Sequence, residues 1–180
     1  MSLLKKTVRR FQESINVEKK RKLDPILRKV QQHGYKSVAV HASIGEDAAA
    51  ISLKGNGETF ALLTTDAIDP KFVGNSPNAA GFSAIYVGID DIVACGGKPV
   101  AASITLGFKD SSVGDQIMDG VLKATRRFKV PLVRGHTDAH SKLCLTSTVI
   151  GYCEKEDFLS IREAKPGDVL AVAWDRDGKP

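Results

Sequence analysis

The most restrictive feature of this sequence is a pair of adjacent aspartates inside an otherwise apolar stretch. Asp90 and Asp91 are the only charged residues between positions 77 and 97. The apolar residues around them repeat at helical spacing: Ile85, Ile89, Ile92 and Val93. The spacing predicts a long helix with one apolar face. Neighbouring positions on a helix differ by about 100°, so at least one of the two carboxylates must border the core.

A carboxylate at the border of a core needs a partner. Burying an unpaired carboxylate costs several kcal/mol, and no Lys or Arg stands three or four residues from either aspartate. The partner must therefore come from another part of the fold or be a bound metal. The same pair interrupts the longest weakly charged run, so no stretch of about 18 uncharged apolar residues exists and no membrane span is expected.

Size and cysteine use favour one globular domain in a reducing compartment. The chain has 180 residues, of which 42% are hydrophobic and 26% charged, enough for one substantial core. Cys95, Cys144 and Cys153 form no CxxC pair, which predicts reduced core thiols rather than disulfides or zinc ligands. No apolar segment follows the first basic residues, so a secretory signal is not predicted and the expected location is cytoplasmic.

Positive charge is concentrated at the start of the chain. Residues 1–30 hold ten Lys and Arg against three acids, although the net charge of the chain is only +5. Residues 1–32 are therefore expected to form a basic arm, with an amphipathic helix followed by a flexible segment around Lys20 and Lys22. Such an arm could bind a polyphosphate or an anionic membrane, or be a solvated helix face. Nucleic-acid binding is a weaker alternative, because Phe11 is the arm's only aromatic residue.

Residues 33–180 show a pattern of strands and helices that predicts an α+β domain. Long helices are expected at 77–94 and 111–128, and a short helix from Asp24-Pro25 to Gly34. The expected strands lie at 37–44, 47–53, 60–68, 99–108, 130–138, 142–152 and 168–175. This order favours a mixed, mostly antiparallel sheet with both long helices on one face.

Acids stand beside small or hydroxyl-bearing residues in four short motifs. These are IGEDAAAI with Glu46 and Asp47, LLTTDAIDP with Thr64, Thr65, Asp66 and Asp69, the Asp90–Asp91 pair, and RGHTDAHS with His136 and Asp138. Hard oxygen ligands of this kind suit Mg²⁺. Each motif alone is also typical of an acid in a turn, at a strand end or on a helix surface. Both standard nucleotide loops are absent, since Gly97-Lys98 is followed by Pro99 and Gly55-x-Gly57 lacks a third glycine.

Taken in order, these motifs resemble the aminoimidazole ribonucleotide synthetase superfamily, which includes thiamine-monophosphate kinase, selenophosphate synthetase and a hydrogenase-maturation dehydratase. GEDAAAI is similar to the family's G-D-D-A-A-V-I element, and LLTTDAIDP to its strand ending in Thr-Thr-Asp. DDIVACGGKPVAASITLGF, KVPLVRGHTDAHSKLCLTSTVIG and AKPGDVLAVA resemble the later helix-to-strand passage, the G-V-P-L-V-G-G-D-T strand and the closing strand. The resemblance spans roughly residues 33–174.

The resemblance implies an amino-terminal domain that binds ATP and Mg²⁺ and pairs with a second copy, so that two sheets form a barrel. Four residues fall on the family's metal-ligand positions: Asp47, Thr65, Asp66 and Asp91. Asp91, rather than Asp90, matches the family aspartate, which leaves Asp90 to point outward. The implied nucleotide-binding residues are Lys20, Lys22, Gly135, His136 and Thr137. A small-molecule substrate is implied as well, although its identity is not.

The sequence also departs from the family pattern. His136 stands where a carboxylate would bind metal, and Asp138 is the nearest substitute. AIDPKFVG replaces the kinase branch's Val-x-Gly-x-His-Phe, so thiamine phosphate is not the predicted substrate. The usual carboxy-terminal domain is missing after WDRDGKP, which is expected of a truncated chain or a half-length protein.

The leading prediction is an ATP- and Mg²⁺-binding domain of an enzyme that acts by phosphoryl transfer or ATP-dependent dehydration. The full-length protein would be the active enzyme and these 180 residues alone would be inactive. The competing hypothesis is a non-catalytic nucleotide-binding or dimerisation module. A zinc site at His136 and His140 is a further alternative, although no cysteine accompanies the pair.

Overall fold

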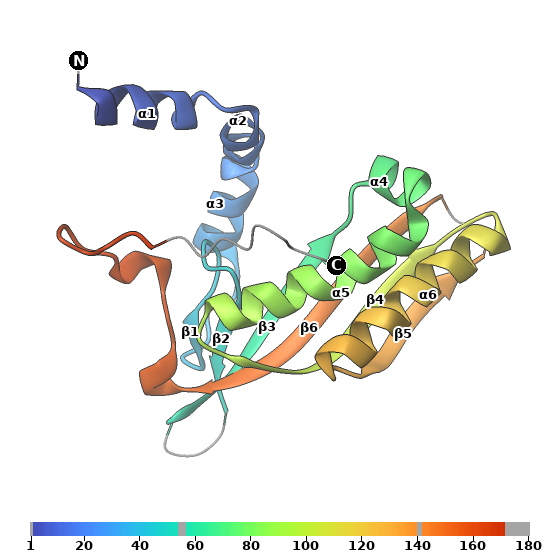
Figure 1. The fold of residues 1–180 in the computed structure, drawn as a ribbon. Helices are drawn as coiled ribbons and strands as arrows, with labels where there is room; N and C mark the ends of the chain where they lie inside the picture. Colours follow the sequence, from blue (N-terminus) through green and yellow to red (C-terminus); the bar gives the residue numbers. More distant parts are fainter. Residues whose placement is uncertain (1, 54–56, 140–141, 172–180) are drawn as a thin grey trace.

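A six-stranded sheet forms the centre of the computed structural model, which describes residues 2–53, 57–139 and 142–171 (Figure 1). Its strands are β1 (Val40–Ala42), β2 (Ala49–Ser52), β3 (Thr59–Ala67), β4 (Lys98–Gly107), β5 (Leu132–Asp138) and β6 (Cys144–Glu154). Their order in the sheet is β1-β2-β3-β6-β4-β5. β4 and β5 pair in parallel, and the other neighbours pair antiparallel. The predicted α+β class and mixed sheet are confirmed.

Two long helices, α5 (Pro77–Ala94) and α6 (Ser111–Phe128), lie side by side on one face of the sheet, as predicted (Figure 1). The short helix α4 (Pro70–Asn75) precedes α5, and Asp69 caps it by accepting from the amides of Lys71 and Phe72. Two 3₁₀ turns, η1 (Lys155–Asp157) and η2 (Ile161–Glu163), follow β6. Asp69 is thus used as a helix cap.

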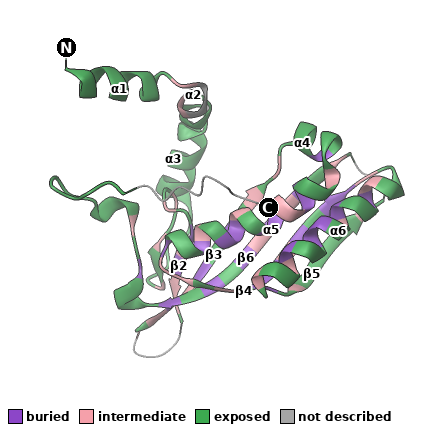
Figure 2. Cartoon of the chain, in the orientation of Figure 1, coloured by how far each residue is buried: buried purple, intermediate pink, exposed green. Residues whose placement is uncertain are grey.

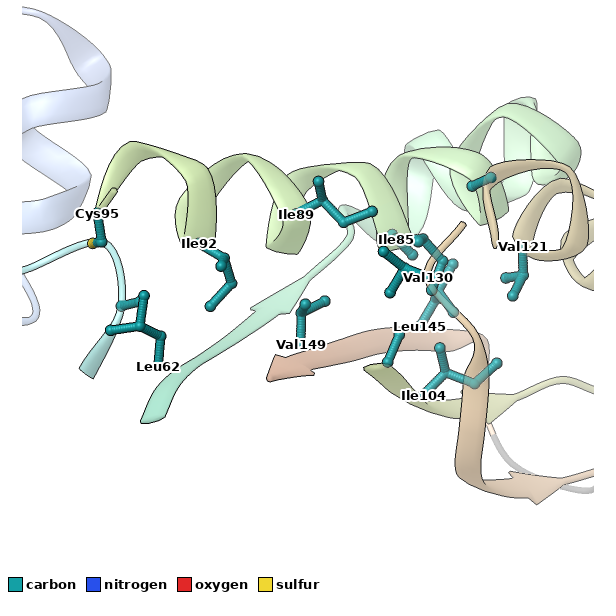
Figure 3. Packing of buried hydrophobic residues seen from close by; sticks show 14 of the residues in the cluster. Leu62, Ile85, Ile89, Ile92, Cys95, Ile104, Val121, Val130, Leu145 and Val149 are labelled. Atoms are coloured by element: carbon teal, nitrogen blue, oxygen red, sulfur yellow. The ribbon is translucent and has the colours of Figure 1, made fainter. Parts of the chain in front are cut away.

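The core lies between α5, α6 and the covered face of the sheet (Figure 2). Figure 3 shows Ile92 of α5 directed toward Leu62 and Val149 of the strands below. At the other end of the helix, Ile85 lies beside Val130 and Leu145. The predicted apolar stripe is wrong at Val93, which is 54% exposed. Val93 follows Ile92 directly, so the turn of about 100° that buries one of them directs the other away.

Three helices form the basic arm: α1 (Leu3–Gln12), α2 (Ile15–Arg21) and α3 (Asp24–His33). In Figure 1, α1 and α2 project away from the sheet. The predicted flexible segment is helical instead, because Ser14 accepts from the Val17 amide as an N-cap and Glu18 pairs with Lys22 one turn later. The predicted apolar stripe of α1 remains uncovered, since Leu4 and Phe11 are 72% and 70% exposed.

Two of the predicted strands differ from the structure. β1 covers three residues rather than 37–44, and its pairing with β2 contains a bulge between Val40 and Ala42. Residues 168–171 form no strand, and the rest of the predicted strand at 168–175 lies outside the described residues. Residues 54–56, between the predicted strands at 47–53 and 60–68, also lie outside them.

The three cysteines differ in exposure. Cys95 and Cys153 are buried as predicted, but Cys144 is exposed, because it begins β6 at the end of the sheet. Burial raises the pKa of the Cys95 and Cys153 thiols, which keeps both in the less reactive protonated form at neutral pH.

Alkylation of the folded protein is therefore expected to modify Cys144 first. Iodoacetamide should label Cys95 and Cys153 at least about tenfold more slowly, since each needs local opening and a proton loss that burial opposes. Peptide mass spectrometry over a time course measures the three rates separately, and labelling in denaturant is the control. Equal rates for the three thiols would contradict the burial described here.

Candidate functional site

Two carboxylates meet at the end of β3, joined by one hydroxyl. The Thr64 hydroxyl donates to Asp91 Oδ2 at 2.7 Å, and it also lies 3.4 Å from Asp66 Oδ2. Thr64 and Asp66 share the helix-covered side of β3 because side chains two residues apart in a strand point the same way. Asp91 reaches them from α5. Gly88 permits this close approach, because a Cβ there would lie 2.5 Å from Val149 Cγ2.

The electrostatics of the pair favour a proton or a cation. Burial raises the pKa of Asp91, the Thr64 hydroxyl lowers it, and the neighbouring Asp66 carboxylate raises it again. Within the described part of the chain, no Lys, Arg or His forms an ion pair with Asp66 or Asp91. Two carboxylates that share one hydroxyl and have no cationic partner are a donor set that fits a divalent metal ion.

Asp90 has a different environment from Asp91. It is exposed on α5, as predicted, whereas Asp91 is half-buried. Of the two adjacent aspartates in this apolar helix, one thus points toward the core and the other toward solvent.

Asp47 lies on the loop that leads into β2, beside the same end of β3. Ala49 pairs with Leu63, so the residues just before Ala49 run beside the Thr64–Asp66 end of β3. Burial is the main cause of the raised pKa of the Cys95 thiol, and the carboxylates of Asp47, Glu46 and Asp91 add to it. Asp47 and Asp91 therefore both lie close to the end of α5.

Thr65 points to the opposite face of the sheet from Thr64. Its hydroxyl is 2.9 Å from the hydroxyl of Thr148 on β6, the residue with which it pairs. The structure thus brings Asp66 and Asp91 together, places Asp47 close by, and directs the Thr65 side chain elsewhere. Among the described residues, no group of three or more His, Cys, Asp and Glu side chains is already close enough to hold a metal ion.

Gly135, His136 and Thr137 lie exposed on β5, the strand at the far edge of the sheet. β6 and β4 separate β5 from β3, which corresponds to roughly 14 Å at the usual spacing between strands. His136 pairs with Thr105 of β4. The nucleotide-binding residues predicted on β5 are therefore not in contact with the Asp66–Asp91 pair, and His140 lies outside the described residues.

Lys20 and Lys22 lie on the arm. Lys20 belongs to α2, Lys22 follows its last residue, and both side chains are exposed. Lys22 Nζ is 3.5 Å from Glu18 Oε1, an exposed pair one helical turn apart. Because α2 projects away from the sheet (Figure 1), the structure does not bring these lysines to the carboxylates.

Comparisons with known proteins agree with this arrangement of motifs. The profile described as "AIR synthase related protein, N-terminal domain" matches residues 45–153. The chain belongs to the AIR synthase-related family. The matched region contains Asp47, Asp66, Asp91 and the β5 residues.

Two curated relatives and one solved structure illustrate the similarity. An uncharacterised protein of Synechocystis is 34% identical over 138 residues, which are 76% of this chain and 41% of the relative. The thiamine-monophosphate kinase of Bacillus subtilis is 30% identical over 140 residues, 74% of this chain and 43% of that protein. The structure of AaThiL complexed with AMPPCP and TMP has a TM-score of 0.61 and 26% identity, covering 77% of this chain and 42% of that one. The chain thus spans about two fifths of these relatives.

Two residues of this AIR synthase-related domain, Thr64 and Glu46, belong to the acidic motifs but were not among the predicted metal or nucleotide ligands. Thr64 donates to one carboxylate and contacts the other, and the period of two along β3 was a signal for it, since Thr64 and Asp66 share a face. Glu46 is buried rather than open to a metal, and its partners are more than a hundred positions away along the sequence.

No helix within 2–53, 57–139 and 142–171 combines the length and hydropathy that crossing a membrane requires.

Proposed function

We propose that this chain is the ATP- and Mg²⁺-binding domain of a synthetase-related or small-molecule kinase-like enzyme that acts by phosphoryl transfer or ATP-dependent dehydration. The observation that carries the proposal is the Asp66–Asp91 pair, joined by Thr64 and lacking a cationic partner among the described residues. The AMPPCP in the AaThiL complex, an ATP analogue bound to a relative, supports it.

In this proposal the carboxylates have distinct roles. Asp66 and Asp91 would hold the metal, and Asp47 would complete the set from the neighbouring loop. The Thr65 hydroxyl has no part in it, because it lies on the opposite face of the sheet beside Thr148. Bound Mg²⁺ supplies positive charge that offsets the negative charge of the phosphate oxygens. The chain's own part is to fix the carboxylates before the ligand arrives, through the Thr64 hydrogen bond and the packing of α5 on β3.

The groups proposed to bind the nucleotide lie outside the carboxylate pair. Gly135, His136 and Thr137 present a backbone, an imidazole and a hydroxyl at the edge strand β5, where each could donate to a phosphate oxygen. Lys20 and Lys22 would reach the phosphates as point charges only if the arm, residues 1–32, moves toward residues 33–180.

The open face of the sheet supports the proposed pairing with a second copy. Leu63 and Ile150, which are directly opposite each other, are 40% and 45% exposed, and Tyr152 beside them is 40% exposed. The α5–α6 layer covers the other face (Figure 1). Two such faces packed together would bury these side chains and join two sheets into a barrel.

Thermal unfolding tests the proposed ligand. ATP with Mg²⁺ at 100 times Kd is expected to stabilise the chain by about 2.7 kcal/mol, or roughly 5–10 °C in Tm. ATP in EDTA and Mg²⁺ alone are the controls. Each should give a smaller shift, because the carboxylates and the phosphates are both negative and repel each other unless the metal lies between them. The absence of any shift at millimolar ATP and Mg²⁺ would count against the proposal.

A non-catalytic nucleotide-binding or dimerisation module is the second candidate. His136 favours it, because an imidazole there supplies no negative charge for a metal and is separated from β3 by two strands. Both candidates are compatible with nucleotide binding. ATP turnover by a form of the protein with the length of its relatives distinguishes them, since a binding module should show none.

A further inference from the structure

Glu46 has a buried acidic group beside the site. Its side chain is 2% exposed, yet its carboxylate accepts two hydrogen bonds and forms one ion pair. The Ser160 hydroxyl donates to Oε1 at 2.8 Å, the Ile161 amide donates to Oε2 at 3.0 Å, and Arg162 Nε lies 3.2 Å from Oε1. Two hydrogen-bond donors and one guanidinium from the same short segment can offset the cost of removing a carboxylate from water.

Arg162 connects the same segment to the loop backbone. While its Nε contacts Glu46, its Nη2 donates to the Ile44 carbonyl at 3.0 Å. Gly45, between the two, has a φ of +107°, and a Cβ there would lie 3.3 Å from Arg162 Nη2. The loop thus takes a backbone conformation suited to glycine and places its carbonyl and carboxylate around one guanidinium. We call this set, Ile44–Glu46 with Ser160–Arg162, the Glu46 clasp.

The chain segment that supplies these donors also contacts the end of α5. The Leu159 amide donates to the Cys95 carbonyl at 3.1 Å, and a Cβ at Gly96 would lie 2.0 Å from the Asp157 carbonyl oxygen. Cys95 in turn donates from its amide to the carbonyl of Asp91 at 3.2 Å. One segment after β6 therefore holds both the loop that carries Asp47 and the helix end that carries Asp91.

We propose that Glu46 is a positioning residue. Through the clasp to Ser160, Ile161 and Arg162, it fixes the neighbouring Asp47 beside the Asp66–Asp91 pair. In this way it sets the affinity of the site for a divalent cation. The inference rests on the proposed function, since it assigns a support to the proposed metal ligands. Glu46 itself does not contact the cation, because its oxygens are occupied by the clasp. Replacing a group that orients metal ligands typically weakens metal binding by about 10–100-fold.

Binding of Mn²⁺, measured from the paramagnetic resonance signal of the free ion, tests the inference. Glu46→Gln is expected to raise the Mn²⁺ Kd about tenfold or more, because the neutral amide forms no ion pair with Arg162 and only one of its two terminal atoms can accept a hydrogen bond. Ser160→Ala, which removes a single donor and is the milder change, should raise it by a smaller factor of about 3. Glu163→Gln is the matched control: it makes the same chemical change on an exposed side chain of η2, and its Kd should equal that of the wild type.

Hydrogen exchange of residues 43–48 provides the second measurement. Faster exchange in Glu46→Gln and Ser160→Ala than in Glu163→Gln, together with the weaker Mn²⁺ binding, supports the inference. A lower Tm with unchanged Mn²⁺ Kd in both clasp variants would overturn it, since the clasp would then be structural only. If Glu46→Gln does not fold, Ser160→Ala decides in the same way. Failure of the wild-type chain to bind Mn²⁺ would instead overturn the proposed metal site, and this inference with it.

Discussion

Replacement of Asp91 by Asn is expected to weaken Mg²⁺-dependent ATP binding by at least about 100-fold, because it removes a metal ligand while keeping the side-chain shape. The same change should stabilise the ligand-free chain. The Thr64 hydroxyl can still donate to the amide oxygen, and the repulsion between Asp91 and Asp66 disappears. For a half-exposed pair, this gain is expected to be a few tenths of a kcal/mol, or roughly 1–2 °C in Tm. Calorimetric titration and thermal unfolding measure the two effects.

The pH dependence of the stabilisation follows from the raised pKa of Asp91. Burial is the main cause, and the Asp66 carboxylate adds to it. An acid whose pKa is raised on folding stabilises the protein fully below its ordinary value, near 3.8, and loses that contribution as the pH rises through the folded-state pKa. Wild type and Asp91→Asn should therefore be equally stable in acid. The variant should become the more stable as the pH rises from about 4 toward neutrality.

Asp90→Asn is the matched control for both measurements. It makes the same change one residue earlier on α5, at an exposed position, so nucleotide affinity and stability should stay close to the wild-type values. Loss of folding in Asp91→Asn would show that the carboxylate is a structural group. Retained Mg²⁺-dependent binding would show that it is not a ligand, and would remove the main support for the proposed site.

Local periodicity predicted the helix that carries this carboxylate, but the partner of the carboxylate could not be read in the same way. The apolar repeat around Ile85, Ile89 and Ile92 specifies which side of α5 is buried, and the burial of α5 then separates Asp91 from Asp90. Which strand lies under Asp91 depends on tertiary packing. The resemblance to a family selected Asp66 correctly as a neighbour, whereas the strand period, applied to Thr64, would have identified the hydroxyl between them.

Other features gave weaker or no local signals. The hydrogen bonds of Glu46 join residues 114 and 115 positions apart, and no pattern near Glu46 distinguishes a clasped carboxylate from a metal ligand. The helix α2 did have local signals, Ser14 as a cap and Glu18 four residues before Lys22, but its sequence lacks the apolar repeat used to predict helices. The only sequence signal for the close contact of α5 with α6 was the presence of glycines inside both helices.

Gly120→Ala is expected to destabilise the chain by about 2–4 kcal/mol, or roughly 5–12 °C in Tm, although alanine is the better helix former. A Cβ at Gly120 of α6 would lie 1.9 Å from the Asn78 carbonyl oxygen and 2.8 Å from the Phe82 nitrogen of α5. Both atoms are backbone, so neither can rotate away. The two helices would have to separate, which would open the core beneath them. Denaturant titration measures the change in the free energy of unfolding.

Gly74→Ala isolates the effect of helix propensity from that of packing. Gly74 is also helical, in α4, but it is exposed and the nearest atom to its Cβ would be Leu143 Cδ2 at an ordinary 3.8 Å. This variant should gain a few tenths to about 1 kcal/mol, because alanine restricts the unfolded chain. Opposite signs at the two positions are what a backbone contact between α5 and α6 requires. A stable Gly120→Ala variant would mean that the helices are further apart, and Asp91, which α5 carries, would then lose its fixed position over Thr64.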